Sequence, residues 1–152
     1  MKRIGKDDYY LEIAHVVAER STCLRRHYGA VVVNHDEIVA TGYNGSARGD
    51  ANCCDVYEDC PRKHKAHNSG DYGDCPAVHA EQNALLSVSR KDTIGATLYL
   101  NGNEVIAASN ESGYQKLPMS ECFPCPICER MIRNAGIVRV VGPQGTVFDL
   151  NN

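Results

Sequence analysis

Two short segments of the sequence combine residue types that can bind a catalytic metal ion. The first has His79 and Glu81 on either side of one alanine, and the second is a Pro-Cys-Pro-Ile-Cys run that starts at Pro124. His79, Cys125 and Cys128 would give a zinc ion three protein ligands and leave its fourth position to water, as in a catalytic rather than a structural zinc site. Both segments lie at predicted helix starts, where the helix dipole favours the thiolate forms of the two cysteines.

Glu81 lies two residues after His79, so its carboxylate can reach the zinc-bound water without binding the metal. Zinc lowers the pKa of such a water to about 7, and a nearby carboxylate can then take its proton. We therefore expect Glu81 to act first as a base and then as an acid. Water would add to a ring carbon that bears an amino group, and ammonia would leave. This chemistry needs an enclosed, mostly dry pocket.

The composition indicates one globular domain over residues 1–152. A chain of 152 residues with 43% hydrophobic and 23% charged residues can build one ordinary core. The formal charge of −3 argues against nucleic-acid binding, which needs clustered positive charge. No secretory signal or membrane-length apolar segment is recognisable, so we expect no membrane contact and a cytoplasmic location. Eight cysteines in that compartment favour metal binding over disulfides.

Patterns of apolar residues predict helices at about residues 7–20, 77–89 and 124–134. Strands are expected at about residues 30–33, 38–43, 97–100, 137–141 and 147–150. Two irregular segments interrupt this series: a cysteine-dense one at about residues 45–76 and an inserted loop at about residues 101–122. A long structureless segment inside a compact domain needs an anchor, and a metal ion can supply it. Strands that alternate with helices predict an α/β sandwich around one sheet.

The two motifs together match the H-x-E…P-C-x-x-C signature of the zinc deaminases. Three further stretches resemble deoxycytidylate (dCMP) deaminases: STCLRRHYGAVVV from residue 21, ATGYNGSARGDANCCD from residue 40 and RMIRNAGIVRVV from residue 130. The resemblance implies a cytidine deaminase-like, three-layer α/β/α sandwich with a mixed five-stranded sheet. It also implies zinc-dependent hydrolysis of dCMP to dUMP with release of ammonia, which supplies thymidylate synthesis. Homo-oligomers, often hexamers, and regulation by dCTP and dTTP are further implications.

Five cysteines before His79 are candidates for a second, structural zinc site. Four thiolates form a closed site of this kind, and such second sites occur in dCMP deaminases. The preferred ligands are Cys23, Cys53, Cys60 and Cys75. The alternatives are Cys54 in place of Cys53, and His64 or His67 in place of Cys23. The competing interpretation is that these are reduced thiols buried in the core.

Cys122, Cys125 and Cys128 also form a Cys-x-x-Cys-x-x-Cys run, which is typical of an iron–sulfur ligand set. No fourth cysteine follows this run. An iron–sulfur cluster would also leave His79 and Glu81 without a role. We therefore interpret Cys122 as a bystander.

The resemblance also indicates contacts to the substrate. Asn44 matches an asparagine that reaches the sugar or phosphate in relatives, although an Asn-Gly pair is also a strong turn signal. Arg25, Arg26 and His27 face the active-site mouth in the family fold, and arginine offers a planar fork to a 5′-phosphate. Alternatively, the two arginines interact with the end of the preceding helix.

Two features depart from the family pattern. Ala47 stands where relatives often have proline, which leaves nucleotide regulation open. The inserted loop would emerge beside the zinc as a lid, a subunit contact or a specificity loop, with Tyr114 and Lys116 as candidate ligand contacts. Competing functions are deamination of cytidine, cytosine or tRNA adenosine, and a zinc-stabilised binding module without catalysis. The intact Glu81 argues against the last of these.

Overall fold

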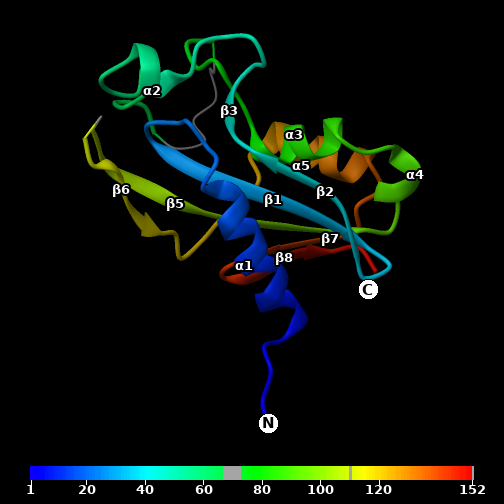
Figure 1. Ribbon diagram of the computed structural model, residues 1–152. Helices are drawn as coiled ribbons and strands as arrows, with labels where there is room; N and C mark the ends of the chain where they lie inside the picture. The colour runs from blue at the N-terminus through cyan, green and yellow to red at the C-terminus, as the bar shows by residue number, and fades with distance from the viewer. Residues whose placement is uncertain (67–72, 110, 152) are drawn as a thin grey trace.

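Six strands form one mixed sheet in the computed structural model, which describes residues 1–66, 73–109 and 111–151 (Figure 1). Five strands follow the order β2-β1-β5-β7-β8, and β6 pairs with the far end of β5. The strands are β1 (Arg26–Asn34), β2 (Glu37–Tyr43), β5 (Thr97–Ser109), β6 (Gly113–Pro118), β7 (Arg139–Gly142) and β8 (Gly145–Asp149). β5 and β7 run parallel, whereas the other paired strands run antiparallel. A separate pairing joins β3 (Gly45–Ser46) to β4 (Ala77–Val78).

Helices cover both faces of this sheet (Figure 1). α1 (Lys6–Ala18) packs on one face, against β1 and β5. α3 (Ala80–Leu86) and α5 (Pro126–Asn134) pack on the opposite face. The remaining helices of the described residues are the short α2 (Cys53–Val56) and α4 (Arg90–Thr93). The expected three-layer α/β/α sandwich is confirmed, and no helix in the described ranges is long and apolar enough to cross a bilayer.

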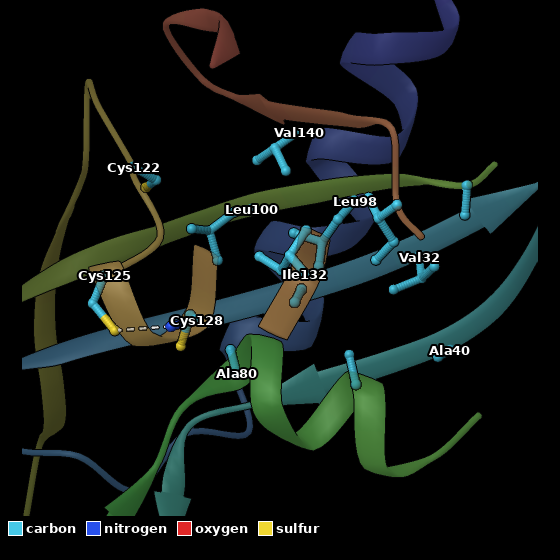
Figure 2. Packing of buried hydrophobic residues seen from close by; sticks show 14 residues of the cluster. Val32, Ala40, Ala80, Leu98, Leu100, Cys122, Cys125, Cys128, Ile132 and Val140 are labelled. Atoms are coloured by element: carbon cyan, nitrogen blue, oxygen red, sulfur yellow. Dashed lines mark hydrogen bonds between the residues drawn. The ribbon is translucent and has the colours of Figure 1, made fainter. Parts of the chain in front are cut away.

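β1 is an interior strand that is buried on both of its faces. Val31 and Val33 pack into the cluster under α1, together with Tyr99. Ala30 and Val32 point the other way, into the cluster that contains residues of α3 and α5. Figure 2 shows Val32 in this cluster. Because successive side chains of a strand alternate between the faces, a strand covered on both sides needs an uninterrupted apolar run. The run at residues 30–33 therefore explains why β1 lies inside the sheet.

Residues 101–122 do not form the expected inserted loop. β5 continues past Leu100 to Ser109, and β6 returns antiparallel beside it. Most side chains of this hairpin beyond Asn103 are exposed, so its sequence lacks the apolar alternation that marks a half-buried strand. The sheet consequently has a sixth strand in addition to the five that were expected.

The expected helix at about residues 77–89 is also shorter in the structure. The backbone of Ala77 and Val78 pairs with β3, so these residues cannot belong to a helix. α3 begins only at Ala80 and ends at Leu86, and α4 follows from Arg90. As a result, His79 is the residue immediately before the first turn of α3.

Two glycines determine how closely the helices approach the sheet. Gly42 of β2 faces α3, where a Cβ atom would overlap backbone atoms of Ala80 and Ala84. Gly29 of β1 faces α1 in the same way. Backbone atoms of a packed helix can move only with the helix itself. The missing side chain at Gly42 therefore allows the first turn of α3 to dock on the sheet.

Replacing Gly42 with alanine should destabilise the fold by about 1–3 kcal/mol, because the added methyl group must push α3 outward. Gly5→Ala is the matched control, since a Cβ at Gly5 meets nothing within 4 Å. Urea unfolding of the two variants and the unmodified protein measures the difference. Equal midpoints for Gly42→Ala and Gly5→Ala would show that the contact between β2 and α3 is not close packed.

Candidate active site

His79 lies beside Cys125 and Cys128, although more than forty residues of sequence separate it from the two cysteines. The Nδ1 atom of His79 is 3.6 Å from Sγ of Cys125 and 3.3 Å from Sγ of Cys128. One donor atom from each of the three side chains lies within 4.8 Å of the other two. Within the described ranges, this is the only group of three His, Cys, Asp or Glu side chains with such spacing. The set that the two motifs predict is therefore brought together by the fold.

Two helix starts bring these side chains together. His79 is the N-cap residue of α3, and its backbone N–H donates to the side-chain oxygen of Gln82 at 2.9 Å. Cys125 is the N-cap residue of α5, and its sulfur accepts the backbone N–H of Cys128 at 3.4 Å (Figure 2). Pro126 occupies the first turn of α5, where its missing N–H costs nothing. The positive ends of both helix dipoles therefore favour negative charge at this point.

The electrostatics of the cluster favour a thiolate. A hydrogen bond from the Cys128 side chain lowers the pKa of Cys125 to about 4, with a smaller contribution from His79, although burial opposes the shift. The same hydrogen bond raises the pKa of Cys128, and the hydrogen bond with Cys125 raises the pKa of His79. A divalent cation would displace these shared protons. One imidazole nitrogen and two sulfurs, partly or wholly buried, fit the ligand preferences of zinc.

Glu81 lies in the first turn of α3, two residues after His79. Its side chain is only 5% exposed, and this burial raises the pKa of the carboxyl group above its usual range. A carboxyl group with a raised pKa can both accept and donate a proton near neutral pH. The side chain also lines a cavity that it shares with His79 and Cys125. Glu81 is thus placed where the sequence predicts an acid–base group.

The cavity beside these groups has a volume of about 110 Å³. Its walls are formed by Cys23, Arg25, Arg26, Tyr28, Asn44, Cys60, Arg62, Ala66, Cys75, Ala77, His79, Glu81, Leu100, Phe123 and Cys125. Most of the predicted site residues are among them. Sequence reasoning missed Tyr28, Arg62 and Phe123. The sequence places Arg62 close to a candidate zinc ligand, because it follows Cys60 and Pro61 directly. Other cations follow in the same segment, so this position does not show which of them lines the cavity.

Asn44 is held in place by the backbone of β1. Its side-chain oxygen accepts the N–H of Tyr28 at 2.8 Å, and its side-chain amide donates to the carbonyl of Arg26 at 2.9 Å. The residue is buried and lines the cavity. These bonds orient the side chain at the end of β2. Its predicted contact with the substrate stays a prediction.

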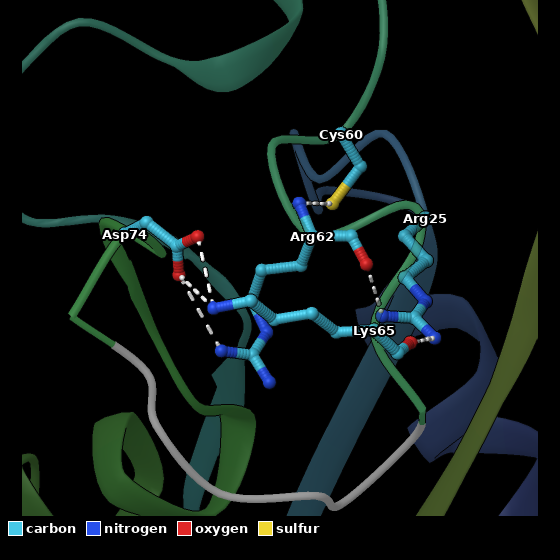
Figure 3. Close-up of polar contacts among 5 residues, drawn as sticks. All are labelled: Arg25, Cys60, Arg62, Lys65 and Asp74. Atoms are coloured by element: carbon cyan, nitrogen blue, oxygen red, sulfur yellow. Dashed lines mark hydrogen bonds and ion pairs between the residues drawn. The ribbon is translucent and has the colours of Figure 1, made fainter.

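Arg25, Arg26 and His27 do not form the single phosphate-binding cluster that the sequence suggests. The two arginines line the cavity, but Arg25 donates to the backbone carbonyls of Arg62 and Lys65 (Figure 3). His27 is fully buried, hydrogen bonded to the carbonyl of Cys23, and outside the cavity wall. The structure thus places His27 away from the cavity wall, and its expected contact with a phosphate stays a prediction. Successive side chains of β1 point to opposite faces of the sheet, which separates His27 from its neighbours.

Tyr114 and Lys116, the two candidate ligand contacts in the β5–β6 hairpin, also lie away from the cavity. The ring of Tyr114 packs edge-on against the ring of His27, with ring centres 4.4 Å apart. The Lys116 ammonium group forms an ion pair with Glu19 at 2.7 Å. Neither residue is part of the cavity wall. The hairpin therefore packs beside α1 and β1 rather than over the metal-binding cluster.

Three of the four cysteines preferred for the second zinc site line the same cavity. Cys23, Cys60 and Cys75 line its wall, and Cys53 is buried. Burial raises the pKa of Cys23, and the neighbouring Cys60 and Cys75 add to this shift. Within the described ranges, however, no three of these sulfurs reach the close spacing of the first cluster. The alternative ligand His64 is exposed, and His67 lies outside the described residues.

Residues 4–142 match the family described as the cytidine and deoxycytidylate deaminase zinc-binding region. The chain belongs to this family. Among curated family members, the deoxycytidylate deaminase of Mycobacterium phage D29 is 39% identical over 150 residues, which cover 95% of this chain and 98% of that protein. The deoxycytidylate deaminase of Schizosaccharomyces pombe is 37% identical over 136 residues. The matched region covers 89% of this chain but 36% of the yeast protein.

A solved structure of a family member shares the fold. The dCMP deaminase from the cyanophage S-TIM5, in complex with dCMP and dUMP, superposes with a TM-score of 0.58 at 27% sequence identity. The match covers 92% of this chain and 83% of that one. The similarity therefore extends over the sheet and both helical layers.

Replacing Cys125 with alanine should remove about one zinc ion per chain, because a three-ligand site cannot retain its metal with two ligands. Cys122→Ala is the matched control: Cys122 is also buried and precedes Cys125 by three residues, but does not belong to the donor cluster. Atomic emission spectroscopy on chelator-washed protein gives the metal content. If Cys122→Ala lost as much metal as Cys125→Ala, the ligand set would have to include the first cysteine of the run.

Proposed function

We propose that this chain is a zinc-dependent hydrolase that converts dCMP and water to dUMP and ammonia. The observation that carries the proposal is the buried carboxyl group of Glu81, which shares one cavity with the donor cluster His79, Cys125 and Cys128. A purely structural metal site has no need of a buried acid beside it. Membership of the deaminase family and the deoxycytidylate deaminases among its relatives support the same reaction.

The ligands for the catalytic zinc would be His79, Cys125 and Cys128. Zinc bound there would supply Lewis-acid chemistry and lower the pKa of water. Glu81 would accept a proton from the attacking water and deliver it to the ring nitrogen of cytosine. The same carboxylate would then pass the second proton to the leaving amino group, so that ammonia departs and a carbonyl group forms. Both transfers use one side chain, which the first turn of α3 holds in the cavity.

Positive charge in the cavity favours a nucleotide over a free base or nucleoside. Arg25, Arg26 and Arg62 line the wall, whereas Glu81 is the one acidic side chain among those lining residues that the structure describes. A 5′-phosphate offers the negative charge that arginine groups bind. Cytosine and cytidine lack this charge, and the net charge of −3 disfavours a tRNA substrate.

A second zinc ion is part of the proposal. Its ligands would be Cys23, Cys53, Cys60 and Cys75. Burial raises the pKa of Cys23 and of Cys53, and the nearby Cys60 and Cys75 sulfurs add to both shifts. The backbone N–H of Arg25 approaches the Cys23 sulfur at 3.5 Å, and that of Arg62 approaches the Cys60 sulfur at 3.4 Å. The contact from Arg25 lowers the pKa of Cys23 and so opposes the effect of burial. This ion would fix the segment of about residues 45–76, which has little regular structure in its described part.

We also propose that the chain assembles into homo-oligomers. Ile127 and Met131 lie one turn apart on α5 and are exposed, as is Leu86 of α3. The side-chain amide of Gln82 is 3.9 Å from the Met131 sulfur, so these exposed surfaces of the two helices adjoin. Adjoining exposed apolar groups are typical of contact sites between proteins. The hexameric size and the regulation by dCTP and dTTP stay predictions.

Ammonia release should be fastest with dCMP when the protein is assayed in parallel with dCMP, deoxycytidine, CMP, dCTP and adenosine. Deoxycytidine and adenosine should be slower because they lack a 5′-phosphate for the arginines of the cavity wall, and the preference over CMP and dCTP is expected from the deoxycytidylate deaminases among the relatives. A coupled glutamate dehydrogenase assay measures the ammonia. Release from adenosine in preference to all cytosine compounds would contradict the proposed substrate class, and release from none of them would favour a binding module.

Glu81→Gln should lower the rate of dCMP deamination by about a hundredfold or more while zinc remains bound, because the amide cannot transfer protons. Glu129→Gln is the matched control, since Glu129 lies on α5 and forms a surface ion pair with Arg133. Steady-state kinetics and the zinc content are measured for both variants. Near-normal turnover in zinc-loaded Glu81→Gln would rule out Glu81 as the acid–base group.

A further inference from the structure

Residues 119–125 connect β6 to α5 and bring Cys125 to the donor cluster. These residues form neither helix nor strand. A hydrogen bond from the N–H of Met119 to the carbonyl of Gly102, at 3.0 Å, holds the start of the segment. Figure 2 shows Cys122 in the part of the segment that leads to Cys125 and α5. The position of the Cys125 sulfur therefore depends on what holds this irregular segment in place.

The side-chain amide of Gln144 holds the middle of the segment. Its Oε1 atom accepts the backbone N–H of Cys122 at 3.1 Å, and its Nε2 atom donates to the carbonyl of Cys122 at 3.1 Å. Gln144 lies in the turn between β7 and β8, 22 residues further along the chain. The amide thus satisfies both backbone groups of one residue, as a hydrogen-bonded partner does in an antiparallel strand pair. We call this two-bond contact the Gln144 clamp.

Gly142 leaves room for the Gln144 clamp. A Cβ atom at Gly142 would lie 2.5 Å from Oε1 of Gln144 and 2.7 Å from the carbonyl oxygen of Cys122. Gly142 is not among the glycines with a positive φ, so its backbone conformation does not require glycine. The missing side chain instead allows the amide and the Cys122 backbone to lie against the end of β7.

The chain between Cys122 and Cys125 is stiff. The ring of Pro124 fixes the φ angle of that residue, and the proline restricts Phe123 before it to extended conformations. The Cys122 side chain is 1% exposed and packs in the core cluster under α3 and α5. Cys125 then begins α5 as its N-cap residue. Because the two intervening residues can adopt few conformations, fixing the backbone of Cys122 restricts where the Cys125 sulfur can lie.

We propose that Gln144 is a positioning residue for the metal-binding cluster, which acts through the backbone of Cys122 on the Sγ atom of Cys125. This assignment rests on the proposed function in one respect, namely the ligand set His79, Cys125 and Cys128. Gln144 is not part of the cavity wall, so its effect would fall on metal retention rather than on contacts with the substrate. Replacing groups that orient a metal ligand typically weakens metal binding by about ten- to a hundredfold.

Gln144→Met tests this role, because it removes both hydrogen bonds and keeps the length of the side chain. The zinc dissociation constant, measured by competition with a chromophoric chelator, should rise by roughly ten- to a hundredfold. Cys125→Ala, measured in parallel, identifies which of the bound zinc belongs to this cluster. In the cobalt-substituted protein, the absorption bands from thiolate coordination should shift or weaken. Gln115→Met is the matched control, since Gln115 is an exposed glutamine of β6 in the same sheet.

Gln144→Glu keeps the test decisive if the methionine variant does not fold. At neutral pH its carboxylate can accept the N–H of Cys122 but cannot donate to the carbonyl, so zinc binding should again weaken. Circular dichroism verifies that each variant is folded. If Cys125→Ala bound as much zinc as the unmodified protein, the proposed ligand set would be wrong, and the role of Gln144 with it. Unchanged zinc affinity and cobalt spectra in folded Gln144→Met or Gln144→Glu, or equal weakening in Gln115→Met, would overturn the role of Gln144 alone.

Discussion

His79 and Cys125 are the N-cap residues of two different helices, and they meet because α3 and α5 pack side by side on one face of the sheet. The donor cluster depends on this single packing arrangement. Neither helix could be shifted without separating the imidazole from the two thiols. The close approach of α3 to Gly42 and the buried side chain of Ile132 on α5 both serve to hold that arrangement. The same helix packing therefore builds the core and positions the metal-binding donor atoms.

Charge is distributed along the cavity in a way that suits one kind of ligand. One end holds the buried Glu81 carboxyl group beside the metal-binding donors, and arginines line other parts of the wall. The protein as a whole is acidic, with a formal charge of −3. The local arrangement of charge therefore matters more than the net charge, because partly or wholly buried guanidinium groups are screened less than charges on the surface.

The parts of the fold that the sequence predicts are those with a repeating physical requirement. The apolar run at residues 30–33 indicates a strand buried on both faces, and the paired motifs indicate ligands at two helix starts. The β5–β6 hairpin escaped prediction because its exposed strands need no apolar alternation. The burial of His27 escaped prediction because it depends on which face of β1 each side chain occupies.

The burial of Arg62 is a further feature that the sequence does not predict. Its sequence context, with Lys63, His64 and Lys65 immediately after it, does not distinguish which cation is buried. That choice follows from tertiary contacts: Arg25 fixes the backbone at two carbonyls, and the Arg62 side chain then points into the cavity. Long-range contacts of this kind leave no periodic pattern in the sequence. They become visible only when segments distant in the chain are placed next to each other.

A crystal structure of the zinc-loaded protein with dUMP, with anomalous data collected at the zinc edge, tests the central claim most directly. We expect an anomalous peak bounded by His79, Cys125 and Cys128, with the pyrimidine ring in the cavity beside Glu81. A zinc ion bound by Cys122 in place of His79, or a pyrimidine ring bound away from Glu81, would contradict it.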